Sequence, residues 1–249
     1  MDGPYLLEVE QVTKSFGGLR AIDHVSFNLA KGKSLGIIGP NGSGKTTLVN
    51  IITGFIRPER GFVRFKDRRI TGILPHKIAQ LGLSRTFQMA RPFYRLPAYK
   101  NLVIPLFSPR VKKLVGGNYG DRDATAIDLL EEVGFERDSS VPFKPASVLP
   151  HGYLKRLELA RCLALRPELI ILDELFSGLS MSEVSSTVPI IEKLQVEGKT
   201  LIMIEHRLRE LFRIVDRVIV LNYGRKIAEG NPKEVMEKRE VKEAYLGTE

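Results

Sequence analysis

The sequence predicts an α/β fold built around a mainly parallel sheet. Two runs, Leu169 to Leu172 and Leu201 to Ile204, are continuously apolar, as strands buried on both faces of such a sheet require. A helical pattern lies between them, and another short apolar strand near residue 35 is also followed by a helical pattern. Alternation of strands and helices is typical of a parallel α/β core.

The part of the chain before residue 88 is rich in strands. The turn residues at Lys31 and Gly32 and from Pro58 to Gly61 separate these expected strands. The expected elements are a strand over Leu6–Thr13, a half-buried strand through Val25, Phe27 and Leu29, a strand from Leu35 to Gly39, a helix over Gly44–Ile52 with Gly54 as its cap, and a strand over Phe62–Phe65.

Residues 88–166 are expected to form a mainly helical insertion. Prolines and glycines interrupt the stretch from 91 to 122, and two clear helical patterns follow. The expected helices are Ala124–Val133, capped by Asp121 or Asp123 and ended by Gly134, and Leu154–Leu165, stopped before Pro167. After the return to the core, a helix over Ser182–Val196 is expected to kink at Pro189.

Composition limits the class of protein. The 249 residues are 43% hydrophobic and 27% charged, which is an ordinary globular composition. The single cysteine, Cys162, excludes an internal disulfide and a cysteine-cluster zinc site. No apolar run approaches the roughly 18 residues that a membrane helix needs, and Met1 to Glu10 lacks the basic start of a secretory signal. We therefore expect a soluble, cytoplasmic chain.

A phosphate-binding motif follows the expected strand at residue 35. The stretch from Gly39 to Thr46, GPNGSGKT, matches G-x-x-x-x-G-K-[ST]. Glycines let backbone N–H groups turn toward phosphate, Lys45 supplies a point charge, and the Thr46 hydroxyl is a Mg²⁺ ligand. The helix that follows directs its N-terminal dipole at the same anions. The residues of this segment expected to bind nucleotide are Gly39, Pro40, Asn41, Gly42, Ser43, Gly44, Lys45, Thr46 and Thr47.

Two adjacent carboxylates end the apolar run at 169–172. Neighbouring residues of a strand point to opposite faces, so Asp173 and Glu174 are expected to have different tasks. We expect Asp173 to hold the Mg²⁺ ion through its water shell and Glu174 to polarise the attacking water. An acidic strand end is common by itself, and the spacing to Lys45 makes this one specific.

Together these motifs make the sequence resemble the ATP-binding subunits of ABC transporters over nearly its whole length. The segments RTFQ at 85–88, IEH at 204–206 and EAYLG at 243–247 are most similar to the branched-chain amino-acid importer type. The resemblance implies a P-loop NTPase core (1–87 and 167–249), an antiparallel N-terminal β subdomain and a helical subdomain (88–166). It implies a metal-site role for Gln88, a γ-phosphate contact for His206 and a stacking role for Phe16.

The family's signature, LSGGQ, is replaced here. The aligned residues are Leu149, Pro150, His151, Gly152 and Tyr153. In the family this segment binds the γ-phosphate of the partner subunit's ATP. Pro150 supplies neither a hydroxyl nor a backbone N–H, so the segment is weakened while the chain's own catalytic set, Lys45, Glu174 and His206, is intact. This asymmetry favours a heterodimer whose partner has an intact signature over a homodimer.

The resemblance implies an ATPase that energises an importer, with ATP and Mg²⁺ as cofactors. The resemblance also implies its partners and its location. These are a second ATPase subunit, permease subunits and, indirectly, a substrate-binding protein, at the cytoplasmic face of the membrane. A coupling segment of the permease would dock on the helical lobe near 89–115, with Phe93, Tyr94 and Leu96 as candidate contacts. The substrate, branched-chain or other amino acids, is chosen by other subunits.

Three alternatives stay open. Aromatic stacking accepts any purine, so GTP remains a candidate beside ATP. The altered signature fits a weakly active regulatory nucleotide-binding module. The net charge of +9 fits a nucleic-acid-directed ABC ATPase, although the basic residues are scattered in short pairs such as Lys112 and Lys113, and we expect no nucleic-acid partner.

Overall fold

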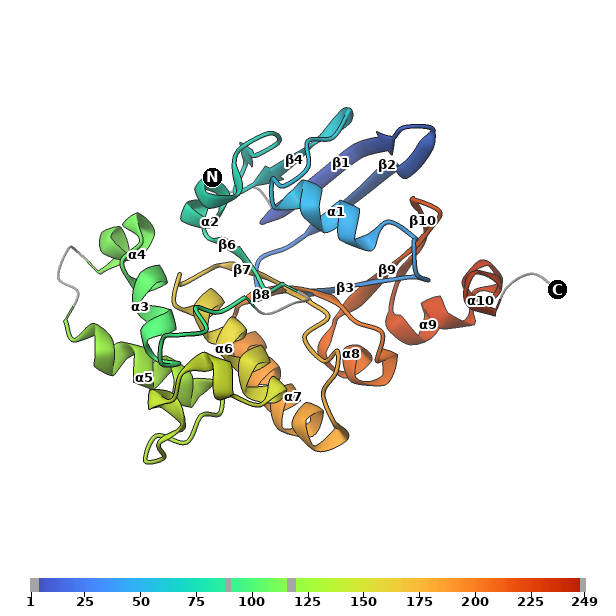
Figure 1. Ribbon diagram of the computed structural model, residues 1–249. Helices are drawn as coiled ribbons and strands as arrows, with labels where there is room; N and C mark the ends of the chain where they lie inside the picture. Colours follow the sequence, from blue (N-terminus) through green and yellow to red (C-terminus); the bar gives the residue numbers. More distant parts are fainter. Residues whose placement is uncertain (1–4, 88–90, 116–119, 247–249) are drawn as a thin grey trace.

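The computed structural model describes residues 5–87, 91–115 and 120–246, whose strands form two sheets (Figure 1). The smaller sheet is antiparallel in the order β2-β1-β4-β5. The larger has the order β10-β9-β3-β8-β7-β6, parallel except for β10. The predicted fold class is thus confirmed. The strands are β1 (Leu7–Phe16), β2 (Leu19–Leu29), β3 (Ser34–Ile38), β4 (Arg60–Phe65), β5 (Arg68–Arg69), β6 (Leu83–Arg85), β7 (Leu169–Asp173), β8 (Thr200–Ile204), β9 (Arg217–Asn222) and β10 (Arg225–Gly230).

The helices of the described residues lie at four places in the order of elements (Figure 1). The first helix follows β3, the second lies between β5 and β6, a helical group is inserted between β6 and β7, and the rest follow β7, β8 and β10. The helices are α1 (Lys45–Ile52), α2 (Pro75–Leu81), α3 (Lys100–Leu106), α4 (Pro109–Leu114), α5 (Arg122–Glu132), η1 (Val141–Phe143), η2 (Ala146–Val148), α6 (His151–Leu163), α7 (Met181–Val196), α8 (Leu208–Ile214), α9 (Pro232–Glu237) and α10 (Arg239–Leu246).

Two hydrophobic clusters pack against opposite faces of the parallel sheet. One joins that sheet to α1 and the antiparallel sheet, with Ile37 and Ile171 from the sheet and Leu48 from α1. The other joins it to α6, α7 and α8, with Leu172 from the sheet. Because β3, β7 and β8 are buried along their whole length, these strands read as continuous apolar runs in the sequence.

The start of α6 differs from the prediction, whereas α7 covers the predicted span to within one residue. Helix α6 begins at His151, three residues before the expected Leu154, because the Pro150 carbonyl accepts the first helical hydrogen bond, from the Leu154 N–H (3.1 Å). A proline is well suited to this position, where no N–H donor is needed. Helix α7 continues through Pro189 to Val196. Asp121 caps α5 by accepting from the N–H groups of Asp123 and Ala124.

No helix in the described ranges combines the length and the apolar character required to cross a bilayer.

Candidate functional site

The parallel sheet brings three sequence motifs to one edge. Strands β3, β8 and β7 are neighbours, so the loop after Ile38, the acids after Leu172 and the residues after Ile204 meet at their carboxyl ends. A pocket of about 390 Å³ lies there. It is lined by the loop from Asn41 to Thr47, by Glu174 and His206, and by Phe16, Leu19, Arg20, Ala21 and Tyr223.

The glycines of the loop are required by its backbone. Gly39 has a φ of 147°, and a Cβ there would lie 2.1 Å from the Leu221 carbonyl oxygen. Gly44, with a φ of 105°, would place a Cβ 2.5 Å from the Ala21 carbonyl oxygen. Both clashes would be with backbone carbonyl oxygens of neighbouring strands. Gly39 and Gly44 therefore fix the position of the loop against β9 and β2, and between them the Ser43 N–H donates to the Pro40 carbonyl oxygen at 3.2 Å.

Lys45 is the first residue of α1 and is almost fully buried. Its Nζ donates to the carbonyl oxygens of Gly39 (2.7 Å) and Pro40 (2.9 Å). Burial lowers the pKa of Lys45, and the nearby carboxylates of Glu174 and Asp173 oppose this shift. An ammonium group has three donors, so the two carbonyls hold the charge inside the loop and leave one donor for a phosphate oxygen.

The adjacent acids have different neighbours, as the sequence predicts. Asp173 ends β7 with its side chain almost fully buried, and its Oδ2 accepts from Arg85 Nη2 at 2.6 Å. Glu174 lies just beyond the strand at a φ of 50°, a left-handed conformation that non-glycine residues seldom adopt. Its Oε1 is 3.2 Å from Nε2 of His206. Glu174 therefore lines the pocket with His206, while Asp173 lies behind the lining.

Two further charged groups lie under these acids, and the sequence analysis did not identify them. Lys155, on α6, is 2% exposed, and its Nζ donates to the Glu174 carbonyl oxygen at 3.0 Å. Glu205 accepts from the Phe176 N–H at 3.0 Å. Burial raises the pKa of Glu205 to about 8, against the Phe176 hydrogen bond and the charge of Lys155, which lower it. Only the three-dimensional packing shows that these charges are buried.

The donor set around the loop fits Mg-nucleotide. Ser43 Oγ is buried inside the loop without a hydrogen-bond partner, and such a hydroxyl is suited to an added acceptor such as phosphate oxygen. The Thr46 hydroxyl and the Asp173 carboxylate are oxygen ligands of the kind that Mg²⁺ prefers. The described residues contain no cluster of three or more acidic, histidine or cysteine side chains that could hold a metal ion.

The pocket has an aromatic side, formed by the expected Phe16 and by Tyr223, which was not predicted from the sequence. Phe16 ends β1, is 48% exposed and lines the pocket, with Lys14 Nζ 5.3 Å from its ring centre. Tyr223, in the turn between β9 and β10, lines the same pocket and is 84% exposed. The Asn-Tyr-Gly sequence marks a turn, but nothing local shows that this turn comes beside Phe16.

The signature segment lies away from this pocket. None of the residues from Leu149 to Tyr153 lines it, and Pro150 is the N-cap of α6 without any side-chain capping bond. Gly152 is close to α7, because a Cβ there would lie 2.2 Å from Oε1 of Glu183. Glu183 in turn forms a capping box with Ser180. The chain thus presents the signature on a separate surface, and Gln88 lies outside the described residues.

A loop between a buried strand and a helix, opposite a carboxylate paired with a histidine, defines a P-loop nucleotide-binding ATPase. Residues 22–177 match the family model described as ABC transporter. The chain is 35% identical to the high-affinity branched-chain amino acid transport ATP-binding protein BraF of Pseudomonas aeruginosa (97% of this chain, 98% of that protein). It is 33% identical to LivG of Escherichia coli K12, a protein of the same description, with the same coverage.

A solved ATP-binding cassette of an ABC transporter, in its ADP conformation, has a TM-score of 0.83 and 31% identity, covering 98% of this chain and 99% of that one. The chain belongs to the ABC transporter family, as its ATPase subunit. The resemblance found in the sequence is confirmed.

We expect Gly39→Ala to weaken the phosphate-binding loop severely. The added Cβ would collide with the Leu221 carbonyl oxygen, so the loop or β9 has to move. We expect a stability loss of at least about 2 kcal/mol, together with loss of ATP binding. Chemical denaturation and fluorescent-nucleotide titration measure the two effects. Gly18→Ala is the control, because nothing lies within 4 Å of its Cβ position. Wild-type binding by Gly39→Ala would contradict this account.

Glu205 makes stability depend on pH. Its folded-state pKa of about 8 lies above the ordinary value of 4.5, so the folded state binds the proton more tightly. This contribution is complete below pH 4.5 and is lost as pH rises toward 8, with a limiting slope of about 1.4 kcal/mol per pH unit. In Glu205→Gln the fall in unfolding free energy between pH 5.5 and 7.5 should become shallower. Equal slopes for both proteins in urea denaturation would refute the assignment.

Proposed function

We propose that this chain hydrolyses ATP to drive an importer for branched-chain or related amino acids. The observation that carries the proposal is one pocket in which the loop around Lys45 faces the Glu174–His206 pair. The names of the relatives, which are transport ATP-binding proteins for branched-chain amino acids, support the substrate class. They also support a location at the cytoplasmic face of the membrane, bound to permease subunits.

The roles of the residues follow from their positions. The loop N–H groups, the Ser43 hydroxyl and Lys45 bind and neutralise the β- and γ-phosphates, and the face of Phe16 stacks on the base. Thr46 and Asp173 would hold Mg²⁺, together with Gln88, whose role rests on the family resemblance alone, and the ion would neutralise charge on the phosphates. Glu174 accepts a hydrogen bond from the attacking water and draws off its proton. His206, 3.2 Å from Glu174, orients that carboxylate and contacts the γ-phosphate.

The site needs a second subunit to be complete. None of the residues from Leu149 to Tyr153 lines the pocket, so a γ-phosphate bound there would have to receive its signature contacts from a partner subunit. This chain in return offers the first turn of α6, whose N–H groups have no intrahelical partners. Pro150 removes the hydroxyl and one N–H from that turn. A heterodimer with an intact partner signature therefore has one strong and one weak site.

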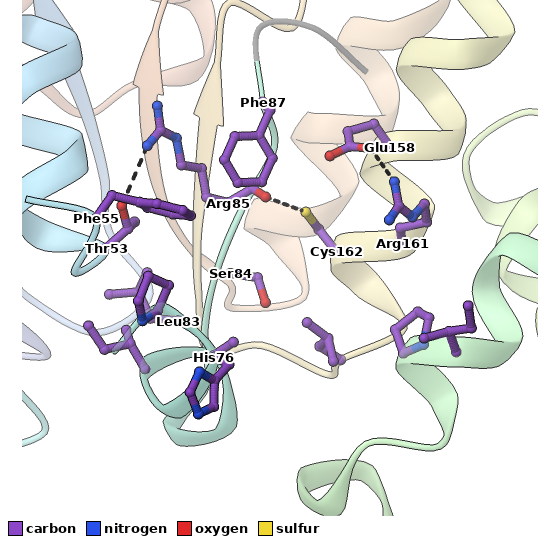
Figure 2. Close-up of a pocket in the computed structure, with 16 residues that line it drawn as sticks. Thr53, Phe55, His76, Leu83, Ser84, Arg85, Phe87, Glu158, Arg161 and Cys162 are labelled. Carbon is purple, nitrogen blue, oxygen red and sulfur yellow. Dashed lines mark hydrogen bonds and ion pairs between the residues drawn. The ribbon is translucent and has the colours of Figure 1, made fainter. Parts of the chain in front are cut away.

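A groove beside the helical insertion is suited to a permease segment. This groove has a volume of about 340 Å³ and mostly apolar walls (Figure 2). Residues of α2, β6, α3 and α6 line it, together with Phe55, which follows α1, and Phe87, which follows β6. Ile104 contributes from α3. Phe93, Tyr94 and Leu96 are exposed, as the sequence analysis required of docking residues, but they lie outside the groove lining. We propose that residues 88–166 form the helical subdomain and that the permease docks at its boundary with the core.

A weakly active regulatory module is the second candidate, and the proline at the N-cap of α6 is the observation that favours it. The paired Glu174 and His206 favour catalysis, because a purely regulatory module has no need for a polarising carboxylate in contact with a histidine. Single-turnover hydrolysis with the natural partner present separates the two functions.

We expect Glu174→Gln to abolish turnover and to retain nucleotide. Glutamine keeps the shape of the side chain but cannot accept the proton of water, so the rate should fall by about 10² to 10⁴. Phosphate release and uptake of radiolabelled leucine by vesicles containing the complete transporter measure this. Glu192→Gln, a half-buried acid on α7 that does not line the pocket, is the control. A Glu174→Gln transporter with wild-type hydrolysis would refute the catalytic assignment.

We expect Pro150→Ser to create homodimers. In a Glu174→Gln background with Mg-ATP, the isolated chain should stay monomeric. A homodimer would have two nucleotide sites, and each would lack the hydroxyl and the N–H that Pro150 does not supply. Serine restores a hydroxyl and an N–H, and one bond to a charged phosphate is worth about 1.5–3 kcal/mol, so association should tighten at least tenfold. Light scattering gives the mass. Val148→Ser adds a hydroxyl in η2, before the start of α6, and is the control. Equal dimerisation with and without Pro150→Ser would refute the heterodimer preference.

A further inference from the structure

One buried guanidinium joins the groove to the acid at the end of β7. Arg85 is the last residue of β6, and only 7% of its side chain is exposed. Its Nη2 lies 2.6 Å from Asp173 Oδ2, and its Nη1 lies 2.6 Å from Asn50 Oδ1 (Figure 2 draws the contact of the same group with Thr53). Asn50 belongs to α1, the helix that begins with Lys45. Arg85 therefore ties the metal-site acid to the helix that follows the phosphate-binding loop.

The side chains of Arg85 and Asp173 are both almost fully buried, so the geometry of their ion pair affects the energy of the carboxylate. A buried carboxylate is costly unless a cation and hydrogen bonds compensate it, and for Asp173 that cation is Arg85. The forked guanidinium makes charge-assisted bonds in fixed directions, so it sets the orientation of the carboxylate as well as its charge. Replacing Arg85 by lysine keeps the charge and removes the fork.

The other side of the same guanidinium contacts the aromatic surface of the groove. The Arg85 guanidinium carbon is 5.2 Å from the centre of the Phe87 ring. Phe87 packs edge-to-face on Phe55, with ring centres 5.8 Å apart, and both rings are exposed to the groove. The backbone of Arg85 is held in turn by α6, because the Cys162 thiol donates to its carbonyl oxygen (Figure 2).

We propose that Arg85 is a positioning residue that couples occupancy of the groove to the Mg²⁺ affinity of the nucleotide site. A segment that docks on Phe87 displaces the ring from the guanidinium. The guanidinium then shifts between Asn50 and Asp173, and the carboxylate turns with it. The coupling rests on the proposed function, because it requires Asp173 to hold Mg²⁺. It assigns Arg85 no contact with nucleotide.

Nucleotide binding with and without the metal tests the coupling. Fluorescent ATP is titrated into the full chain in Mg²⁺ and in EDTA, and the ratio of the two dissociation constants is the readout. Arg85→Lys should reduce this Mg²⁺ enhancement at least fivefold and change the affinity in EDTA by less than twofold. Phe87→Ala should reduce the enhancement in the same direction by a smaller factor. Ile104→Ala, on the α3 side of the same groove, should leave it unchanged.

The outcomes distinguish this inference from the proposed function. If Asp173→Asn keeps the full Mg²⁺ enhancement, the metal-site assignment is wrong and the coupling falls with it. If Asp173→Asn loses the enhancement and Arg85→Lys retains it, only the coupling is refuted. Equal losses in Mg²⁺ and in EDTA would show a general structural role and would also refute it. Should Arg85→Lys fail to fold, Asn50→Ala removes one partner of the guanidinium and must give the same selective loss.

Discussion

The parallel pairing of β3, β8 and β7 is the constraint on which the site depends. Each strand is fully buried, so its backbone polar groups are satisfied by its neighbours, and a slip of register by one residue would move every side chain into the packing of the opposite face. The register of β7 on β8 places Asp173 opposite Ile204, so the residues that follow both strands leave the sheet at the same level. The loop from Gly39 to Lys45, the acids at 173 and 174, and His206 converge for this reason, although they are separated by up to 167 residues in the chain.

Local sequence was sufficient to predict the parts of the site that follow a strand. The glycine pattern before Lys45 and the acids after Leu172 have spacings that few other arrangements explain. The alternation of strands with helices predicted the fold class, and the observed sheet order confirms it. Arg85 and Glu205 were found within recognised segments but given no role, because a charge is normally exposed and only tertiary packing shows that these are buried. The start of α6 was missed for the opposite reason, since a proline and a glycine near a helix start resemble a loop.

Buried ionisable groups are concentrated near the carboxyl edge of the parallel sheet, where the site lies. Lys45, Arg85, Lys155, Asp173 and Glu205 are all nearly inaccessible, and each contacts a backbone group or a charge of opposite sign. Hydrophobic residues of similar volume would satisfy the packing at lower desolvation cost. Charges in such a place hold other groups in fixed directions, and the left-handed backbone of Glu174 shows how tightly the surroundings determine this turn.

Lys155 connects the two surfaces that a nucleotide would meet in a dimer. It lies one turn after the signature segment on α6, and its ammonium holds the carbonyl of Glu174 at 3.0 Å. In the dimer proposed above, the first turn of the same helix would meet the partner's nucleotide. Lys155 would then join that outer surface to the backbone of the acid in the chain's own pocket. Pro150 lacks the hydroxyl and the N–H of the family's signature, and the contact of Lys155 with the Glu174 carbonyl does not depend on either group.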